Sequence, residues 1–303
     1  MITRFVDVHP GLTAARVAVL VLTLLAAAGG GASGVRAQGP AAGPAPPVSK
    51  VEQNGTCRNF RREEGVSVCD FGVAPEQAAR NVALVGDSHA SHWRAALDEV
   101  ANERGWRGLS VTHTSCPFSK ATKLLPEPTR SGCVRWASAL PGFFAGHPEI
   151  DTLFAVGITG GKVRAAPGQT MFEAKVDGYL SAWSELPDTI KHIVVIRDTP
   201  KMTRRTVGCV DRALARHTLA RTSCAVPRRT ALAADPQVAA AHEERTRHAQ
   251  VVDLTARLCS SRQCFPVIGG VQVYKDVHHF TLVFAKTLGP PLARAVDRAM
   301  SAW

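Results

Sequence analysis

The chain has 303 residues and a formal net charge of +11, from 36 basic and 25 acidic residues. Hydrophobic residues make up 45% of it, which is enough to build a core and excludes an intrinsically disordered polymer. A chain of this length forms one large domain or two ordinary ones.

Residues 1–37 have the pattern of a secretory signal peptide. Arg4 and Arg16 precede an apolar run over 17–28, and a small-x-small cleavage site ends at Ala37. The run is shorter than the roughly 20 residues that a membrane span needs. We expect an exported protein, secreted or extracytoplasmic in the periplasm or cell wall. An uncleaved segment that tethers the protein to the membrane is the alternative.

The eight cysteines are an even number, as expected for an exported protein with disulfides. Sequence alone leaves the connectivity open, because eight cysteines allow about 105 pairings. The residues fall into four close couples, and pairing within each would close a local loop worth ~2–4 kcal/mol. The couples are Cys57/Cys69, Cys116/Cys133, Cys209/Cys224 and Cys259/Cys264. A zinc site would need two Cys-x-x-Cys hooks, which the sequence lacks.

The segment after residue 37 begins with two short irregular regions. Residues 38–52 are a Pro/Ala-rich linker, and residues 53–80 are expected to form a disulfide-tied N-terminal flap. Over 81–303, strands alternate with helices, which predicts a parallel sheet covered on both faces. Strands are expected over 81–86, 109–112, 152–157, 192–197 and 250–254, and helices over 91–103, 134–144, 171–185 and 280–299.

A basic insertion covers residues 197–229. It holds nine basic residues and two acidic ones, a net charge of +7. Such a surface suits an anionic polymer or lipid headgroups, and a solvated surface without a ligand is the alternative. We do not expect nucleic acid as a partner, because the chain is exported and shows no recognisable nucleic-acid-binding module.

A strand, a sharp turn and a helix are predicted over Val-Ala-Leu-Val-Gly-Asp-Ser-His-Ala-Ser-His-Trp, residues 82–93. Ser88 lies on the turn, beyond the carboxyl end of a parallel strand, where active sites of such sheets are found. The N–H groups at the helix start suit an oxyanion formed there. In the alternative interpretation, Asp87 or Ser88 only caps the helix.

The motif Tyr-Lys-Asp-Val-His-His-Phe-Thr, residues 274–281, precedes the last predicted helix. Asp276-x-x-His279 lets one turn present a base and the group that orients it. His279 would take the proton of Ser88, and Asp276 would hold the imidazole tautomer. The alternative is a helix cap at Asp276 or Thr281 beside a surface histidine.

The segments Val-Gly-Asp-Ser-His-Ala-Ser-His-Trp (85–93) and 274–281 resemble motifs of the SGNH (GDSL-like) hydrolase superfamily. More narrowly, they resemble the extracytoplasmic SGNH domain of membrane acyltransferases that O-acylate bacterial surface glycans. Two cysteine-closed loops, at 115–136 and 258–264, are also similar to that subgroup. The resemblance covers about residues 55–300. It implies a flavodoxin-like three-layer α/β/α sandwich with a central parallel sheet.

The resemblance also assigns roles: Ser88 is the nucleophile, His279 the base and Asp276 its orienter. It makes the Ser88 N–H one oxyanion donor. The superfamily takes another donor from an Asn after its third strand, but here that segment reads Ala-Val-Gly-Ile-Thr-Gly-Gly. Gly157 or Ser115 could supply an N–H group instead.

We expect an exported O-acyl esterase or acyltransferase that forms an acyl-enzyme on an acylated cell-envelope glycan or glycolipid, without a cofactor. Because the chain shows no multi-pass membrane domain, transfer would need a separate integral-membrane acyltransferase or a soluble donor. One alternative is a catalytically silent SGNH-fold module that binds an anionic envelope polymer.

A metal site is the other alternative, with ligands among His89, His92, His113, His278 and His279. It is disfavoured because no carboxylate completes a known motif. His89 and His92 are expected instead to line the pocket or pack the helix, and we expect no metal.

Overall fold

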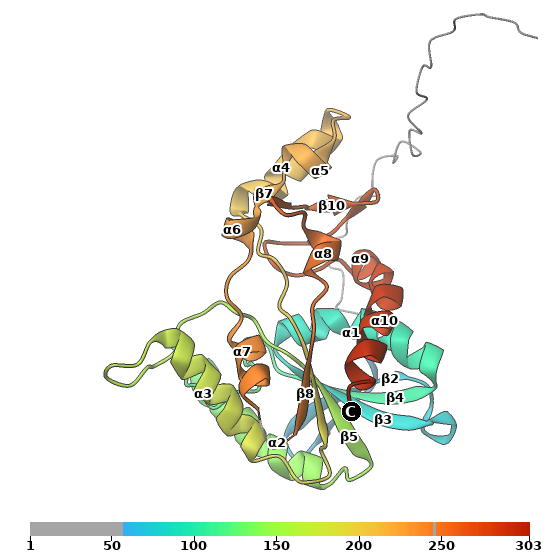
Figure 1. The fold of residues 1–303 in the computed structure, drawn as a ribbon, viewed down its shortest axis with the longest axis vertical. Helices are drawn as coiled ribbons and strands as arrows, with labels where there is room; N and C mark the ends of the chain where they lie inside the picture. Colours follow the sequence, from blue (N-terminus) through green and yellow to red (C-terminus); the bar gives the residue numbers. More distant parts are fainter. Residues whose placement is uncertain (1–56, 245–246) are drawn as a thin grey trace, which may run out of the picture. The chain divides into compact units, whose positions relative to one another are not determined.

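The computed structural model describes residues 57–244 and 247–303, so the predicted signal peptide (1–37) and linker (38–52) lie outside the described residues. A seven-stranded sheet of order β1-β2-β4-β3-β5-β6-β8 runs through the fold (Figure 1). Its strands are β1 Arg58–Glu63, β2 Val66–Gly72, β3 Arg80–Gly86, β4 Trp106–Thr112, β5 Ile150–Val156, β6 His192–Ile196 and β8 His248–Val252. The five strands from β4 to β8 are parallel, and β1 and β2 pair antiparallel. The predicted α/β sandwich with a central, mostly parallel sheet is confirmed.

Helices cover both faces of the sheet. They are α1 Ser88–Arg104, α2 Thr129–Ala145, α3 Met171–Ser184, α4 Arg204–Ala215, α5 Ala220–Ser223, α6 Arg228–Ala231, α7 Pro236–Glu243, α8 Thr255–Leu258, α9 Leu282–Thr287 and α10 Gly289–Met300. Short elements complete the fold: η1 Pro75–Gln77, β7 Val226–Pro227, β9 Gln263–Cys264, β10 Val267–Ile268 and β11 Val271–Gln272. No helix among the described residues combines the length and apolar character needed to cross a membrane.

Two apolar cores lie on opposite faces of the sheet, as the alternation of β3 requires. Val82 and Leu84 belong to the core under α1, α9 and α10, whereas Ala83 and Val85 face α2, α3 and α7. Figure 1 shows α3 and α7 on one side of the sheet and α10 on the other. All four residues are fully buried, which explains why a strand without polar alternation forms here.

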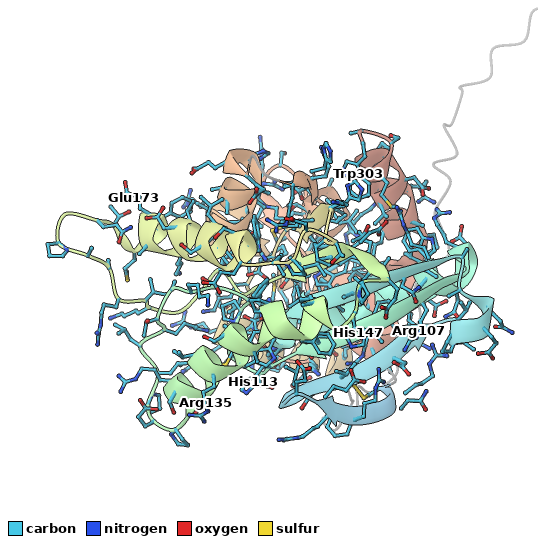
Figure 2. The ribbon with its side chains drawn as sticks, turned by 90° about the horizontal axis from the view of Figure 1, so that it is seen from below. Arg107, His113, Arg135, His147, Glu173 and Trp303 are labelled. Carbon is cyan, nitrogen blue, oxygen red and sulfur yellow. A yellow bond between two sulfur atoms is a disulfide. The ribbon has the colours of Figure 1, made fainter. Side chains whose placement is uncertain are left out.

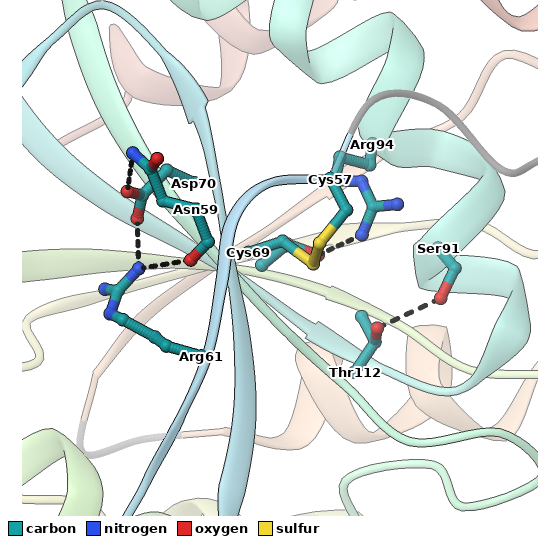
Figure 3. Close-up of a disulfide and its surroundings, with 9 residues drawn as sticks. Cys57, Asn59, Arg61, Cys69, Asp70, Ser91, Arg94 and Thr112 are labelled. Atoms are coloured by element: carbon teal, nitrogen blue, oxygen red, sulfur yellow. Dashed lines mark hydrogen bonds and ion pairs between the residues drawn. A yellow bond between two sulfur atoms is a disulfide. The ribbon is translucent and has the colours of Figure 1, made fainter.

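The described part of the predicted disulfide-tied flap, 53–80, forms two strands that extend the sheet. β1 and β2 form a hairpin, β2 pairs with β4, and the Cys57–Cys69 disulfide ties the two strands together (Figure 3). Sequence reasoning missed these strands because their pattern has little periodicity, and pairing with β4 stabilises them.

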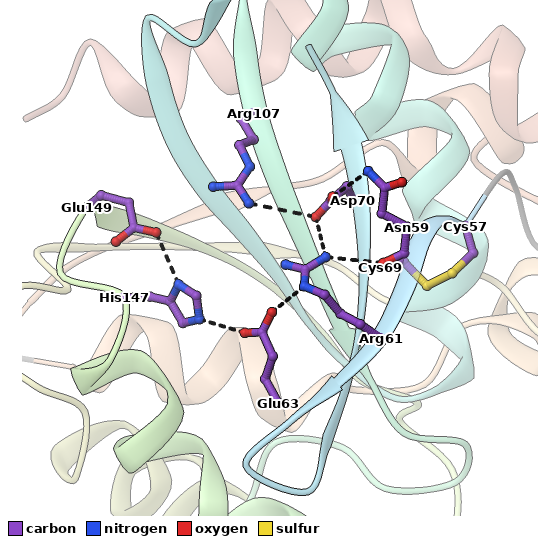
Figure 4. Close-up of polar contacts among 9 residues, drawn as sticks. All are labelled: Cys57, Asn59, Arg61, Glu63, Cys69, Asp70, Arg107, His147 and Glu149. Carbon is purple, nitrogen blue, oxygen red and sulfur yellow. Dashed lines mark hydrogen bonds and ion pairs between the residues drawn. A yellow bond between two sulfur atoms is a disulfide. The ribbon is translucent and has the colours of Figure 1, made fainter. Parts of the chain in front are cut away.

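Side-chain contacts fix this hairpin to its neighbours. Arg61 forms ion pairs with Glu63 and with Asp70, at 2.8 Å for the latter (Figure 4). His147, beyond the end of α2, lies 2.9 Å from Glu63 through its Nε2 atom and 3.1 Å from Glu149 through Nδ1. The network connects β1 to the loop between α2 and β5.

The predicted closing helix over 280–299 is two helices, α9 and α10. Pro290 and Pro291 in the first turn of α10 have no N–H to donate to α9, so the helix breaks at Leu288. Elsewhere the expected helices form, and α3 starts with a capping box between Thr170 and Glu173. Glu173 lies near the start of α3 (Figure 2). The basic insertion contains α4 and α5 rather than only a loop.

All four cysteine couples form disulfides as predicted. The bridges are Cys57–Cys69, Cys116–Cys133, Cys209–Cys224 and Cys259–Cys264. Each closes a loop local in sequence, which is why spacing alone was informative.

Candidate active site

The turn that carries Ser88 depends on Gly86. Its φ is +147°, and a Cβ atom there would lie 1.8 Å from the Val156 carbonyl oxygen on the neighbouring strand, so only glycine fits. Asp87 is the N-cap of α1, and its side chain accepts the His89 N–H at 2.9 Å. The cap therefore binds the second amide of the helix, whereas the first, the Ser88 N–H, makes no hydrogen bond to another described residue.

Ser88, His279 and Asp276 lie in one hydrogen-bonded chain. The Ser88 Oγ atom is 2.9 Å from His279 Nε2, and His279 Nδ1 is 2.7 Å from Asp276 Oδ2. The other carboxylate oxygen of Asp276 accepts the backbone N–H groups of His278 and His279, both at 2.8 Å. Three contacts thus hold Asp276 in place, and the Asp-x-x-His turn presents the imidazole toward the serine.

The electrostatics of Asp276 suit a permanently charged orienter. Partial burial would raise the pKa of Asp276, but hydrogen bonds from the His279 ring and from the His278 and His279 amides outweigh it. The pKa of Asp276 is therefore held well below its usual range. A charged Asp276 fixes the proton of neutral His279 on Nδ1, which leaves Nε2 free to accept the serine proton.

A second chain of polar groups runs beside the first. The Nδ1 atom of buried His89 bonds to Asp198, and its Nε2 atom lies 2.8 Å from Nδ1 of His278. Asp198 also accepts backbone N–H groups of Thr159 and Thr199, both at 2.7 Å. His89, which follows Ser88, and His278, which precedes His279, are therefore in contact with each other as well.

Burial and charge set the protonation of this second chain. Burial would lower the pKa of His89, but the charge and hydrogen bond of Asp198 raise it above the ordinary value. Burial would raise the pKa of Asp198, and the charge and hydrogen bonds around it lower it. Burial, with the charges of His279 and His89, lowers the pKa of His278 to about 4. When His89 is protonated, it donates to Asp198 and to Nδ1 of neutral His278.

The histidines considered for a metal separate into two groups. One ring nitrogen each of His89, His278 and His279 lies within 4.8 Å of the others, so these three could hold a metal ion. His92 packs against Phe280 at 4.6 Å between ring centroids, and neither of its ring nitrogens has a partner among the described residues. Burial lowers the pKa of His92 well below its ordinary value, as expected of a packed, neutral ring.

The amides after β5 are used to hold carboxylates. The Ile158 N–H donates to Asp87 at 3.0 Å, and the Thr159 N–H donates to Asp198 at 2.7 Å. These two groups are therefore not oxyanion donors in this state. Gly157 is buried, and a Cβ atom there would lie 2.5 Å from the Tyr179 hydroxyl. Its role as an oxyanion donor stays a prediction.

Ser115, the other donor considered, has a left-handed backbone conformation with φ of +67°. Its carbonyl accepts Nζ of Lys123 at 2.7 Å. Burial lowers the pKa of Lys123, and the charge of Asp87 acts in the opposite direction. Lys123 is thus a cation near the base of the turn that the motifs did not reveal.

Sequence reasoning also missed Asp198. It stands two residues beyond the end of β6, at the carboxyl edge of the parallel sheet. That position was a usable signal, because chemistry in such sheets gathers at this edge. In the sequence, Asp198 appears only as one of the two acidic residues of the basic insertion.

Comparisons with known proteins agree with this architecture. Residues 56–294 match the model of a family described as "SGNH domain (fused to AT3 domains)". The fold is similar to the periplasmic domain of a lipopolysaccharide acetyltransferase from Salmonella ser. Paratyphi A, with a TM-score of 0.56 and 11% sequence identity. That match covers 75% of this chain and 90% of the other, and at this identity it shows the fold alone. No curated protein sequence matches the chain.

Proposed function

Because the chain belongs to the family of SGNH domains fused to AT3 domains, we propose that it is an exported serine-dependent O-acyl esterase or O-acyltransferase. Its substrate is an acylated cell-envelope glycan or glycolipid. The observation that carries the proposal is the contact of Ser88 Oγ with His279 Nε2 at 2.9 Å, with Asp276 on the far side of the imidazole. Export rests on the predicted signal peptide and the four disulfides.

The mechanism follows from these contacts. His279 Nε2 takes the proton as Ser88 Oγ attacks the ester carbonyl, and charged Asp276 stabilises the imidazolium. The Ser88 N–H stabilises the oxyanion. The C–O bond of the ester breaks, the leaving alcohol takes the proton from His279, and the acyl group remains on Ser88. Water or a sugar hydroxyl then gives a proton to His279 and attacks the acyl-enzyme, which releases an acid or a new ester.

The acceptor distinguishes the two activities. With water the protein is an esterase, and with a sugar hydroxyl it is a transferase. An AT3-type membrane acyltransferase is the donor that the family description favours for the second case. Domain limits follow the same proposal: residues 1–37 are removed on export, and the SGNH domain starts near the first disulfide.

The test is mass spectrometry of the purified protein after incubation with acetyl and longer acyl esters. We expect an acyl adduct on the peptide that contains Ser88, and none in Ser88→Ala. Ser91→Ala is the matched control, because Ser91 lies one helical turn away and bonds to Thr112 Oγ1 at 3.0 Å. It should acquire the adduct as the wild type does. Absence of any adduct, with no ester hydrolysis, would favour the silent binding module.

A further inference from the structure

A cavity of about 730 Å³ lies at the end of the fold where β6 and β8 finish. Four arginines line it: Arg197, Arg228, Arg229 and Arg262. No acidic side chain is among its lining residues in the described part of the chain. The lining residues include part of α6 and residues that follow α8, and these two helices lie at the same end of the fold (Figure 1).

The backbone that carries these arginines is rigidly held. β7 pairs with β9, and the Arg228 N–H donates to the Arg262 carbonyl at 2.8 Å. The Cys259–Cys264 disulfide closes the hairpin that includes Arg262. Two like-charged residues, at the start of α6 and directly before β9, are thereby held next to each other.

The arginine charges are only partly balanced. Arg197 lies 3.7 Å from Asp253, and Arg228 donates to the Ser260 carbonyl at 3.1 Å. The guanidinium groups of Arg229 and Arg262 have no protein partner among the described residues, and both residues are exposed. Fixed like charges repel one another, and a bound anion relieves that repulsion.

We propose that this arginine cavity binds phosphate groups carried by the substrate, and this inference rests on the proposed function. Guanidinium forks match the geometry of phosphate oxygens and donate two parallel hydrogen bonds. Four guanidinium groups with one nearby carboxylate suit a group with several negative charges. A single sugar carboxylate carries only one. The ligand class is therefore a phosphate or diphosphate on an envelope glycan or glycolipid.

The cavity is connected to the catalytic residues through two short loops. Arg197 directly precedes Asp198, which bonds to His89. Asp235 directly follows Ala234, which lines the cavity, and its carboxylate accepts the Asp198 N–H at 2.9 Å. Both sites thus lie at the carboxyl edge of the sheet.

Calorimetric titration of the full chain with inorganic pyrophosphate tests the proposal. We expect the wild type to bind, and the Arg229→Ala/Arg262→Ala variant to bind at least about tenfold more weakly, from the loss of charge-assisted hydrogen bonds. Arg216→Ala removes the same charge from an exposed arginine at the end of α4 and should bind within about twofold of the wild type. No binding by the wild type, or an equal loss in Arg216→Ala, overturns the proposal.

Additional measurements identify the ligand and control for misfolding of the double variant. Binding of glucuronate as tight as that of pyrophosphate overturns the assignment to phosphate. Retention on phosphatidylglycerol vesicles that requires Arg229 and Arg262 assigns the phosphate to a lipid headgroup, whereas pyrophosphate binding without retention assigns it to a soluble or glycan-borne group. Arg262→Glu, a single surface change, should also lose binding and guards against misfolding of the double variant.

Ser88→Ala should bind pyrophosphate as the wild type does. Failure of the Ser88 adduct therefore counts against the proposed function, and failure of pyrophosphate binding counts against the arginine site.

Discussion

The Nε2 atom of His89 lies 2.8 Å from the Nδ1 atom of His278, across 189 residues of chain. His89 follows Ser88 and His278 precedes His279. The two motifs are therefore joined by two contacts, one between His89 and His278 and one between Ser88 and His279. The rings of His278 and His279 also lie 4.1 Å apart between centroids. The start of α1 and the Asp-x-x-His turn are therefore fixed to each other by paired contacts.

We predict that Asp276→Asn lowers kcat for a small acetyl ester by about 10²–10⁴-fold, because the asparagine no longer fixes the His279 tautomer or stabilises the imidazolium. Steady-state kinetics with an intact fold by circular dichroism measure this. Asp188→Asn, an exposed carboxylate at the opposite edge of the sheet, is the control and should leave kcat unchanged. Equal kcat for Asp276→Asn and wild type would contradict the proposed role of Asp276 in orienting His279.

The buried pair of His89 and Asp198 should be costly to break. His89→Gln leaves Asp198 charged and buried, and we expect the free energy of unfolding to fall by about 3–5 kcal/mol. Denaturant unfolding measures it. His248→Gln changes an exposed histidine and should cost less than about 0.5 kcal/mol. Similar losses in both variants would show that the buried pair is not stabilising.

The same pair should make stability depend on pH in both directions. The pKa of His89 is raised by folding, so its contribution is fully present below the unfolded pKa and is lost as pH rises through the folded one. The pKa of Asp198 is lowered, so its contribution is present above the unfolded pKa and is lost as pH falls. The stability difference between wild type and His89→Gln should therefore be largest between about pH 4 and 6.5. A difference that does not change with pH contradicts this.

Gly86→Ala should lower the free energy of unfolding by ~3 kcal/mol or more, because the new Cβ atom would meet the Val156 carbonyl in a backbone conformation that favours glycine. Gly132→Ala in α2 has no heavy atom within 4 Å of the new Cβ, and alanine should stabilise the helix by up to about 1 kcal/mol. Thermal and denaturant unfolding of both variants give the comparison. A stable Gly86→Ala protein would refute the close approach of β3 and β5.

The contribution of each disulfide to the free energy of unfolding should increase with the length of the loop that it closes. Replacing Cys116 and Cys133 by alanine, at a separation of 17 residues, should cost about 3 kcal/mol from the entropy of the unfolded chain. The same change at Cys259 and Cys264, separated by 5 residues, should cost about 2 kcal/mol. Denaturant midpoints of the two double variants test the order, and a reversed order would mean that lost packing outweighs chain entropy.

Local patterns in the sequence were enough for much of the fold. The strand-turn-helix around Ser88, the Asp276-x-x-His279 turn and the four disulfides each depend on residues close together in the chain. Alternation of strands and helices predicted the parallel sheet, and β3, β4, β5, β6 and β8 lie within a few residues of their expected positions. The predicted closing helix was too long, because the apolar periodicity continues through Pro290 and Pro291, which break the helix at Leu288.

The sequence by itself thus determined the elements and the two motifs, because backbone propensity and turn geometry act over a few residues. Only the tertiary structure decided which distant residues meet. It placed Asp198 and His89 beside His278, paired β2 with β4, and gathered Arg197, Arg229 and Arg262 around one cavity. These contacts depend on strand order and packing, because they join residues that are far apart in the sequence and that only the folded sheet brings together.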